Sequence, residues 1–372
     1  MTRHDCSPLP AALPLPPRVD LDRAAQWDYR PDEQALFTDA LVWRRAQGIV
    51  PATAASFDLH LLVIDAQKDF CFPEGALYVG GRSGRGAVED NKRLSSWIYR
   101  HLVAVNTMTT TLDTHLPYQI FFAPFWVDGD GQPLHAHTVL TTSDVVEGRA
   151  LPNPDLAWQF HGGDYEWLKR QCAFYCASLE KGGLYDLYLW PPHCLLGSDG
   201  HALAGVIHEA HLFHAYTRGA QAWTEIKGDN PLTENYSILR PEVLDTFDGG
   251  VLAHKNTRFI ERLLAADAIV VAGQASSHCV RSSVDDLRRE IEARDPALAA
   301  KVYLLADCMS AVTVPDGQGG FLADFTVQAA EAEERFAAAG MHVVRSTDPL
   351  ESWPGLAERW RRHTAKTAYA ER

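Results

Sequence analysis

The feature that most constrains the fold of this chain is a regular alternation, from Asp58 onward, of short apolar runs with segments of helical periodicity. Strand-length apolar runs separated by amphipathic helices predict βαβ units and a parallel sheet. We predict strands at residues 60–65, 105–113, 222–227, 268–273, 301–307 and 342–345. Helices are expected at residues 88–103, 257–266, 280–293 and 322–339, the last one ended by Gly340. The expected fold class is therefore α/β: a doubly wound, Rossmann-like, mainly parallel six-stranded sheet with helices on both faces.

Three segments lie outside this alternation. Residues 1–57 begin Pro-rich and then carry Leu36, Phe37, Leu41 and Val42 at the spacing of a short amphipathic helix, which predicts an N-terminal extension. The main domain is expected at residues 58–350. A stretch rich in aromatics, Gly and Pro interrupts it at about residues 119–183, and we interpret that stretch as a large insertion. Residues 351–372 are expected to form a polar C-terminal tail with a peripheral helix.

Charge and hydropathy exclude several classes of partner. The chain of 372 residues has a net charge of −14 and no Lys/Arg-rich block, so it lacks the electrostatic footprint of nucleic-acid binding. No apolar stretch approaches the ~20 residues that cross a bilayer, and prolines interrupt the N-terminus where a signal peptide would be apolar. The seven cysteines have no repeating spacing and are interpreted as thiols. We expect a cytoplasmic protein with a small-molecule substrate, which binds neither nucleic acid nor a membrane.

Reactive side chains follow several predicted strands at their carboxyl ends. Asp65, Asp113 and Lys227 end three strands, His115 comes shortly after Asp113, and Cys279 begins the helix after the strand at residues 268–273. Each has a plain structural explanation, since an Asp often caps a turn and a free Cys is usually a small buried hydrophobe. Carboxyl ends of parallel strands, however, meet at one edge, where ligands bind. A helix N-terminus and a nearby lysine would both lower the thiol pKa.

A metal site is also suggested by residue type and spacing. Asp113 and His115 share one face of an extended segment because they are two residues apart. His193 offers a third ligand, behind two prolines that fix the backbone before it. Two His and one Asp are a composition used by catalytic zinc and non-haem iron sites.

Other metal-ligand types carry weaker signals. The segment HEAH at residues 208–211 misses the zinc-protease motif by one residue, so we interpret it as a polar helix face. Cys172 and Cys176 share a helical face but lack a second Cys/His pair. His135 and His137 lie in the predicted insertion and could approach the metal.

Five short segments occur in a fixed order along the chain. They are IDAQKDFC at 64–71, DTH at 113–115, WPPHC at 190–194, KGDNPLTENYS at 227–237 and GQASSHCVRSSVDDL at 273–287. Together they resemble the signature motifs of nicotinamidases, in the isochorismatase-like cysteine hydrolase superfamily, over roughly residues 58–347. The resemblance implies that residues 58–350 are an amidohydrolase domain converting nicotinamide to nicotinate and ammonia through a thioester. It also implies a place in pyridine-nucleotide salvage.

The resemblance further implies roles for individual residues. The implied catalytic triad is Asp65, Lys227 and Cys279. The implied ligands of one divalent ion, zinc before iron or manganese, are Asp113, His115 and His193. A cis peptide at Gln274-Ala275 would aim two oxyanion-hole donors at the substrate, the backbone N–H groups of Ala275 and Cys279. The side chains implied around the substrate ring are Phe70, Trp190, Tyr236 and His278.

Three departures from the family pattern keep alternatives open. Gln119 stands where many members have a further His, so three protein ligands and waters would hold the metal. His193 follows His115 by 78 positions, far more than usual, so the loop between them is enlarged. Ser277 replaces a more common Asp.

Two other functions compete with nicotinamide hydrolysis. One is the same chemistry on another small amide, such as a carbamoyl or maleamate-like substrate, which the enlarged loop keeps open. The other is a catalytically silent binding or scaffold member, and the presence of all six triad and metal positions weighs against it. The partner expected in either enzymatic case is a small-molecule amide, and we expect a homo-oligomer.

Overall fold

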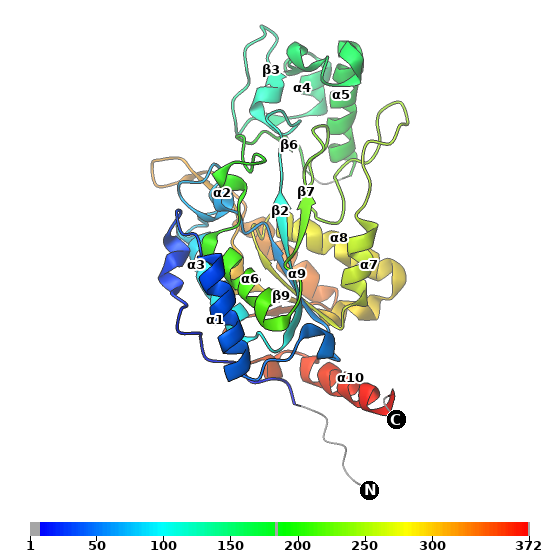
Figure 1. The fold of residues 1–372 in the computed structure, drawn as a ribbon. Coiled ribbons are helices and arrows are strands. Elements are labelled where there is room, and N and C mark those ends of the chain that lie inside the picture. The colour runs from blue at the N-terminus through cyan, green and yellow to red at the C-terminus, as the bar shows by residue number, and fades with distance from the viewer. Residues whose placement is uncertain (1–7, 183–184, 371–372) are drawn as a thin grey trace.

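The protein is built around a six-stranded parallel sheet (Figure 1). A computed structural model describes residues 8–182 and 185–370. In spatial order the strands are β12 (His342–Val344), β9 (Val302–Leu305), β8 (Ala268–Gly273), β1 (Leu59–Ile64), β2 (Val105–Asp113) and β7 (Trp223–Lys227). Each neighbouring pair in this order is parallel. The chain runs from β1 through β2 to β7, then returns to β8 on the other side of β1. The predicted doubly wound α/β fold is confirmed.

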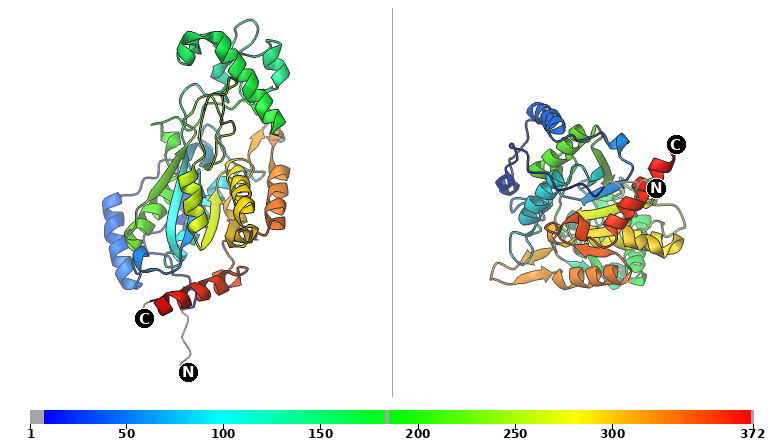
Figure 2. Two further views of the ribbon diagram at one scale, coloured as in Figure 1. Left: turned by 90° about the vertical axis from the view of Figure 1, so that its right-hand side faces the viewer. Right: turned by 90° about the horizontal axis from the view of Figure 1, so that it is seen from below.

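Helices cover both faces of the sheet. One face carries α3 (Gly86–Arg100) and α6 (Gly205–Arg218), which pack together, and α1 (Glu33–Ala46) packs on α6. The other carries α7 (Thr257–Ala265), α8 (Cys279–Arg294) and α9 (Thr326–Ala338) (Figures 1 and 2). Alternate residues of β1 therefore enter different cores: Leu61 and Val63 lie in one apolar cluster, Leu62 and Ile64 in the other. A sheet covered on both faces explains why all six residues of β1 are buried and five of them are apolar.

Both ends of the chain pack on this core. The carboxylate of Glu209, a buried residue of α6, accepts hydrogen bonds from the hydroxyls of Tyr29 and Tyr99, which ties the N-terminal extension to α3 and α6. The C-terminal helix α10 (Leu356–Ala370) crosses the lower end of the sheet (Figure 2). No helix in the described residues is long and apolar enough to span a membrane.

A group of short elements stands above the carboxyl ends of the strands (Figure 1). We call it the upper segment, residues 119–182 and 185–188. Its elements are β3 (Trp126–Val127), β4 (Val139–Leu140), α4 (Thr142–Val146), β5 (Leu151–Pro152), α5 (Tyr165–Lys181) and β6 (Leu187–Tyr188). Two small antiparallel pairs, β3 with β5 and β4 with β6, hold it together. Its first aromatics, Phe121, Phe122, Phe125 and Trp126, are fully buried, whereas Trp158 is exposed.

Two expectations from the sequence are corrected, one about a helix start and one about burial. The predicted helix at residues 322–339 begins later, because β11 (Phe321–Asp324) pairs with β10 (Thr313–Pro315) in an antiparallel hairpin. Asp324 then accepts a hydrogen bond from the backbone N–H of Thr326, where α9 starts. The segment at 208–211 is helical as expected, but it is not a polar surface, since Glu209 and His211 are buried against α3 and the sheet.

Four histidines, three of them buried and His278 partly buried, are held uncharged by their surroundings. Burial lowers the pKa of His60, His211 and His278 to about 3 and that of His214 to about 4. Burial disfavours the charged imidazolium because it removes water from the ring. These four side chains therefore make folding sensitive to acid.

Candidate active site

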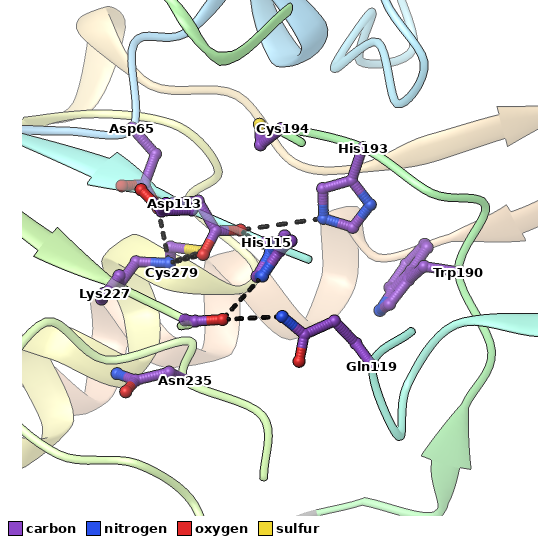
Figure 3. A network of polar contacts seen from close by, with 12 residues as sticks. Asp65, Asp113, His115, Gln119, Trp190, His193, Cys194, Lys227, Asn235 and Cys279 are labelled. Carbon is purple, nitrogen blue, oxygen red and sulfur yellow. Dashed lines mark hydrogen bonds and ion pairs between the residues drawn. The ribbon is translucent and has the colours of Figure 1, made fainter. Parts of the chain in front are cut away.

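The predicted reactive residues meet at the carboxyl edge of the sheet (Figure 3). Asp65 follows β1, Asp113 ends β2, Lys227 ends β7, and Cys279 opens α8 just after β8. In the register of β2 with β7, Asp113 lies directly opposite Lys227. The convergence follows from topology, because β1, β2, β7 and β8 are parallel and end at the same level.

Lys227 is the centre of a buried charge cluster. Its Nζ lies 2.9 Å from Asp65 Oδ2, 2.8 Å from Asp113 Oδ1 and 3.5 Å from Cys279 Sγ. All four side chains are buried. One ammonium therefore neutralises part of two carboxylates and contacts the thiol at the same time.

The environment sets different protonation tendencies for these groups. Burial raises the pKa of Asp65, and the nearby Asp113 adds to the effect while Lys227 opposes it. Burial disfavours the charge of Asp113 too, but the attraction of His115 and Lys227 outweighs it, so its pKa lies well below the ordinary value. Burial also opposes the Lys227 charge, yet Asp113 and Asp65 hold its pKa well above the usual range.

The thiol departs from the expectation of a lowered pKa. Burial raises the pKa of Cys279 well above its ordinary value, and the attraction of Lys227 does not compensate for it. Desolvation therefore outweighs both the lysine and the helix start. Cys279 rests as a thiol and needs a base, and the adjacent Asp65 is a carboxylate whose proton affinity is raised for that task.

Two supporting residues, which the sequence analysis did not identify, hold Asp65 and Asp113 in place. Thr111 Oγ1 accepts the backbone N–H of Asp65 at 3.0 Å and donates to Asp65 Oδ1. Gln67 binds both backbone groups of Asp113: its Oε1 accepts the N–H at 2.7 Å and its Nε2 donates to the carbonyl at 2.7 Å. Thr111 lies two residues before Asp113 and so shares its face of the strand, which was the available signal.

Asp113, His115 and His193 form a group that could hold a metal ion. One ligand atom from each lies within 4.8 Å of the others, and all three residues are buried. Nδ1 of His115 lies 3.0 Å from the carbonyl oxygen of Gly228, and Nδ1 of His193 lies 2.8 Å from that of Pro191. An Nδ1–H donated to each carbonyl would leave the two Nε2 atoms, which lie 2.8 and 3.7 Å from Asp113 Oδ2, free to bind an ion shared with that carboxylate. Carbonyl-oriented imidazoles beside a carboxylate are the donor arrangement a divalent cation requires.

The loop behind this group leaves room for nothing larger than glycine. Gly228 has φ +87°, and an added Cβ would lie 2.6 Å from His115 Cε1 and 2.8 Å from Asp113 Oδ1. Its carbonyl also accepts a hydrogen bond from Gln119 Nε2 at 3.0 Å (Figure 3). Gln119 therefore braces His115 through a shared acceptor.

A small, largely aromatic cavity adjoins Cys279. Its volume is about 30 Å³. The residues that the resemblance places around a substrate ring, Phe70, Trp190, Tyr236 and His278, all line it. Trp190 Nε1 donates to the Tyr236 hydroxyl at 2.8 Å, and the His278 ring lies 5.5 Å from Trp190 and 4.7 Å from Phe325. Phe325, which precedes α9, was not anticipated from the sequence.

Two residues that line the cavity, Ala275 and Cys279, have backbone N–H groups free to donate. The peptide bond Gln274-Ala275 is cis, as the resemblance implies. Within the described part of the chain, neither the N–H of Ala275 nor that of Cys279 has a hydrogen-bond acceptor. Ser277, in place of the more common Asp, accepts the N–H of Val312 at 3.0 Å and hydrogen-bonds Nδ1 of His278 at 2.8 Å. It thus orients a wall of the cavity.

The weaker candidates do not join this site. In the described residues, the His, Cys, Asp and Glu side chains close enough to share an ion are Asp113, His115 and His193, without His135 or His137. Nδ1 of His137 instead hydrogen-bonds the Tyr188 hydroxyl at 3.0 Å. Cys172 and Cys176 are buried on the apolar side of α5. The described cysteines are all free thiols, and Cys6 lies outside the described residues.

The chain thus presents a doubly wound α/β fold with a buried Cys/Asp/Lys centre beside an Asp/His/His group. No family model matches the sequence, and no curated protein matches it. Among solved structures, it is similar to yeast nicotinamidase, with 18% identity over 77% of this chain and 98% of that one and a TM-score of 0.46. An Acinetobacter baumanii nicotinamidase/pyrazinamidase has 17% identity over 78% of this chain and 97% of that one, with a TM-score of 0.43. A zinc complex of Pyrococcus horikoshii pyrazinamidase has 17% identity over 77% and 99%, with a TM-score of 0.40.

Proposed function

We propose that this protein is a cysteine amidohydrolase that converts nicotinamide to nicotinate and ammonia. The observation that carries the proposal is the contact of one buried ammonium, Lys227 Nζ, with both the Cys279 thiol and the Asp65 carboxylate. Nucleophile, base and cation lie within hydrogen-bond reach of one another, as covalent acyl transfer requires. The two backbone N–H groups without acceptors, on Ala275 and Cys279, add an oxyanion hole.

The first half-reaction follows from this geometry. Asp65 takes the proton of Cys279, and Sγ attacks the amide carbon. The N–H groups of Ala275 and Cys279 stabilise the oxyanion, each by about 3 kcal/mol. Protonated Asp65 then gives its proton to the amide nitrogen, the C–N bond breaks, and ammonia leaves a thioester on Cys279.

The second half-reaction restores the resting thiol. Asp65 accepts a proton from a water that attacks the thioester carbon, and the C–S bond breaks. The proton returns to Cys279 as the carboxylic acid forms. Lys227 stabilises the anionic forms of both partners, since its own pKa is held well above the usual range.

The metal group fits this assignment. We propose that Asp113, His115 and His193 hold one divalent ion, zinc before iron or manganese, which would supply a Lewis acid beside the pocket. Asp113 has a second task, because its other oxygen contacts Lys227 at 2.8 Å. The ligand set and the catalytic cation are therefore joined through one carboxylate.

The size of the cavity bears on the substrate. A cavity of about 150 Å³ holds a benzene ring, whereas the space beside Cys279 is about 30 Å³. A pyridine ring therefore enters only if the aromatic wall moves. This observation favours, as a second candidate, the same hydrolysis of a smaller amide of the carbamoyl or maleamate type.

Ammonia release across a panel of amides tests the proposal. Nicotinamide, pyrazinamide, maleamate and a carbamoyl compound should be compared on the metal-loaded protein. Cys279→Ala should lower kcat by more than about 10³-fold with the fold retained. Cys176→Ala, a second buried free cysteine, should retain activity. Ammonia release from none of the amides would leave the silent binding role, and activity retained by Cys279→Ala would remove the nucleophile assignment.

A further inference from the structure

A second cleft lies behind the start of α8, between that helix and α5 of the upper segment. It consists of two cavities of about 290 and 360 Å³ that share Glu242, Asp286 and Arg289 in their walls. Phe174 and Ser178 of α5 close the far side. In Figure 1, α5 stands above α8, so the cleft is at the junction of the upper segment with the sheet domain.

Most guanidinium groups around the cleft already have carboxylate partners. Arg335 pairs with Asp285 at 2.7 Å, Arg289 with Asp286 at 2.9 Å, and Arg288 with Glu292 at 2.6 Å. In each of these pairs a neighbouring carboxylate neutralises the guanidinium, so these three arginines by themselves suggest no ligand.

Two arginines differ from these. Arg281 lines the 290 Å³ cavity together with Tyr185, and Arg240 lines the 360 Å³ cavity. Neither guanidinium makes an ion pair or a hydrogen bond with another described residue, and Nε of Arg240 is buried. In a chain with a net charge of −14, two unpaired cations in one cleft are unusual.

Of the two carboxyls that line both cavities, Glu242 and Asp286, Glu242 is poorly ionised. Burial raises the pKa of Glu242 to about 7, Asp286 adds to the effect, and Arg240, Arg281 and Arg289 oppose it. Four arginines and three carboxyls line the 290 Å³ cavity, and one of those carboxyls is Glu242, so this cavity keeps a net positive charge at neutral pH. Uncharged donors complete the wall: the buried Tyr185 hydroxyl has no partner among the described residues, and Ser282 lies beside it.

We propose that this cleft binds phosphate, either free or as the monoester of a small metabolite. A phosphate monoester carries about −1.5 to −2 charges at pH 7 and three acceptor oxygens, which matches two free guanidiniums better than a carboxylate does. Arginine forks bind phosphate oxygens in pairs. Arg281 binds the anion in the 290 Å³ cavity, where the hydroxyls of Tyr185 and Ser282 donate to its remaining oxygens, and Arg240 adds positive charge from the adjoining cavity.

The cleft is connected to the candidate active site. Arg281 and Ser282 lie in the first turn of α8, whose first residue is Cys279. On the other side, the Tyr185 ring lies 5.4 Å from the ring of Tyr236, which lines the cavity beside Cys279. Binding here is nevertheless independent of the proposed function and can be measured without turnover.

Isothermal titration of the full-length, metal-loaded protein with inorganic phosphate tests the site. Ribose 5-phosphate serves as the monoester arm and acetate as the carboxylate arm. We expect saturable one-to-one binding of phosphate, weakened about tenfold or more in Arg281→Gln and in Arg240→Gln. Arg258→Gln, which removes a guanidinium whose side chain is 85% exposed, should bind as the wild type does. Tighter binding of ribose 5-phosphate than of free phosphate would identify a metabolite as the natural ligand.

Weaker binding in the arginine variants could also come from misfolding, so a variant that should bind phosphate more tightly is needed as well. At pH 8, where Glu242 is largely ionised, Glu242→Gln should bind phosphate at least about threefold more tightly than the wild type, because one repelling charge is gone. Equal affinities of the Arg281→Gln and Arg258→Gln variants would overturn the proposal, and so would no saturation below about 10 mM. Acetate that binds as tightly as phosphate would overturn the assignment of ligand class.

Discussion

Replacing Lys227 with methionine should leave two buried carboxylates, Asp65 and Asp113, without their shared cation. Methionine keeps the apolar stem but removes an ammonium that lies 2.9 Å from Asp65 and 2.8 Å from Asp113 in side chains no more than 5% exposed. The net charge of the cluster changes from −1 to −2. Removing one partner of a buried ion pair costs about 3–5 kcal/mol, so we expect Lys227→Met to lose that much of its free energy of unfolding.

Urea unfolding at pH 7.5 with the metal chelated measures the loss. Lys255→Met is the matched control, because Lys255 lies 2.8 Å from Glu290 but is 45% exposed, and its removal should cost under about 1 kcal/mol. Adding Asp65→Asn to Lys227→Met removes one of the two unneutralised negative charges. The double variant should therefore be more stable than Lys227→Met alone.

Urea unfolding of Lys227→Met and wild type at lower pH gives a second check. Without Lys227, the pKa of Asp65 rises further above its unfolded value, so the folded state binds the proton more tightly. Stability from such a group is present below the unfolded pKa and lost as pH rises through the folded one. The gap between Lys227→Met and wild type should thus narrow as pH falls. A loss no larger than that of Lys255→Met, or a further loss on adding Asp65→Asn, would refute the reasoning.

Three further predictions address the metal, acid stability and the upper segment. His193→Ala should fold yet retain well under half of the approximately one equivalent of divalent metal found in wild type by elemental analysis, and wild-type metal content would remove the ligand assignment. His60, His211, His214 and His278 bind protons only in the unfolded chain between pH 6.5 and about 4, so the free energy of unfolding should fall as pH falls by up to about 1.4 kcal/mol per histidine per pH unit. Equal urea midpoints at pH 7 and pH 5 would contradict this. Replacing residues 119–183 with a Gly/Ser linker should alter amide preference or raise KM at unchanged assembly state if the segment is a lid, and loss of assembly with unaltered selectivity would show an interface instead.

The sequence by itself determined the fold class and which reactive residues would meet. The alternation of apolar runs with helical segments predicted a sheet with helices on both faces, and β1 (Leu59–Ile64) is a strand of that kind, buried at every residue. Parallel strands end at one edge, so the placement of Asp65, Asp113, Lys227 and Cys279 at strand ends was enough to predict that they meet. Both inferences need only local pattern and chain direction. Helix starts were less predictable, as the hairpin before α9 shows, because strand pairing overrode the local helical period.

Only the tertiary structure decided the chemistry of the site. A helix start and a nearby lysine predicted a lowered Cys279 pKa, yet full burial raises it, and burial depends on every element packed around the thiol. Gln67 hydrogen-bonds Asp113 from 46 positions away, and Gly228 contacts His115 from 113 positions away. Local sequence periodicity cannot predict contacts between residues so far apart in the chain. The volume beside Cys279 is set by side chains from distant segments of the chain. Desolvation and cavity shape are sums over such long-range neighbours, so they exist only once the chain has folded.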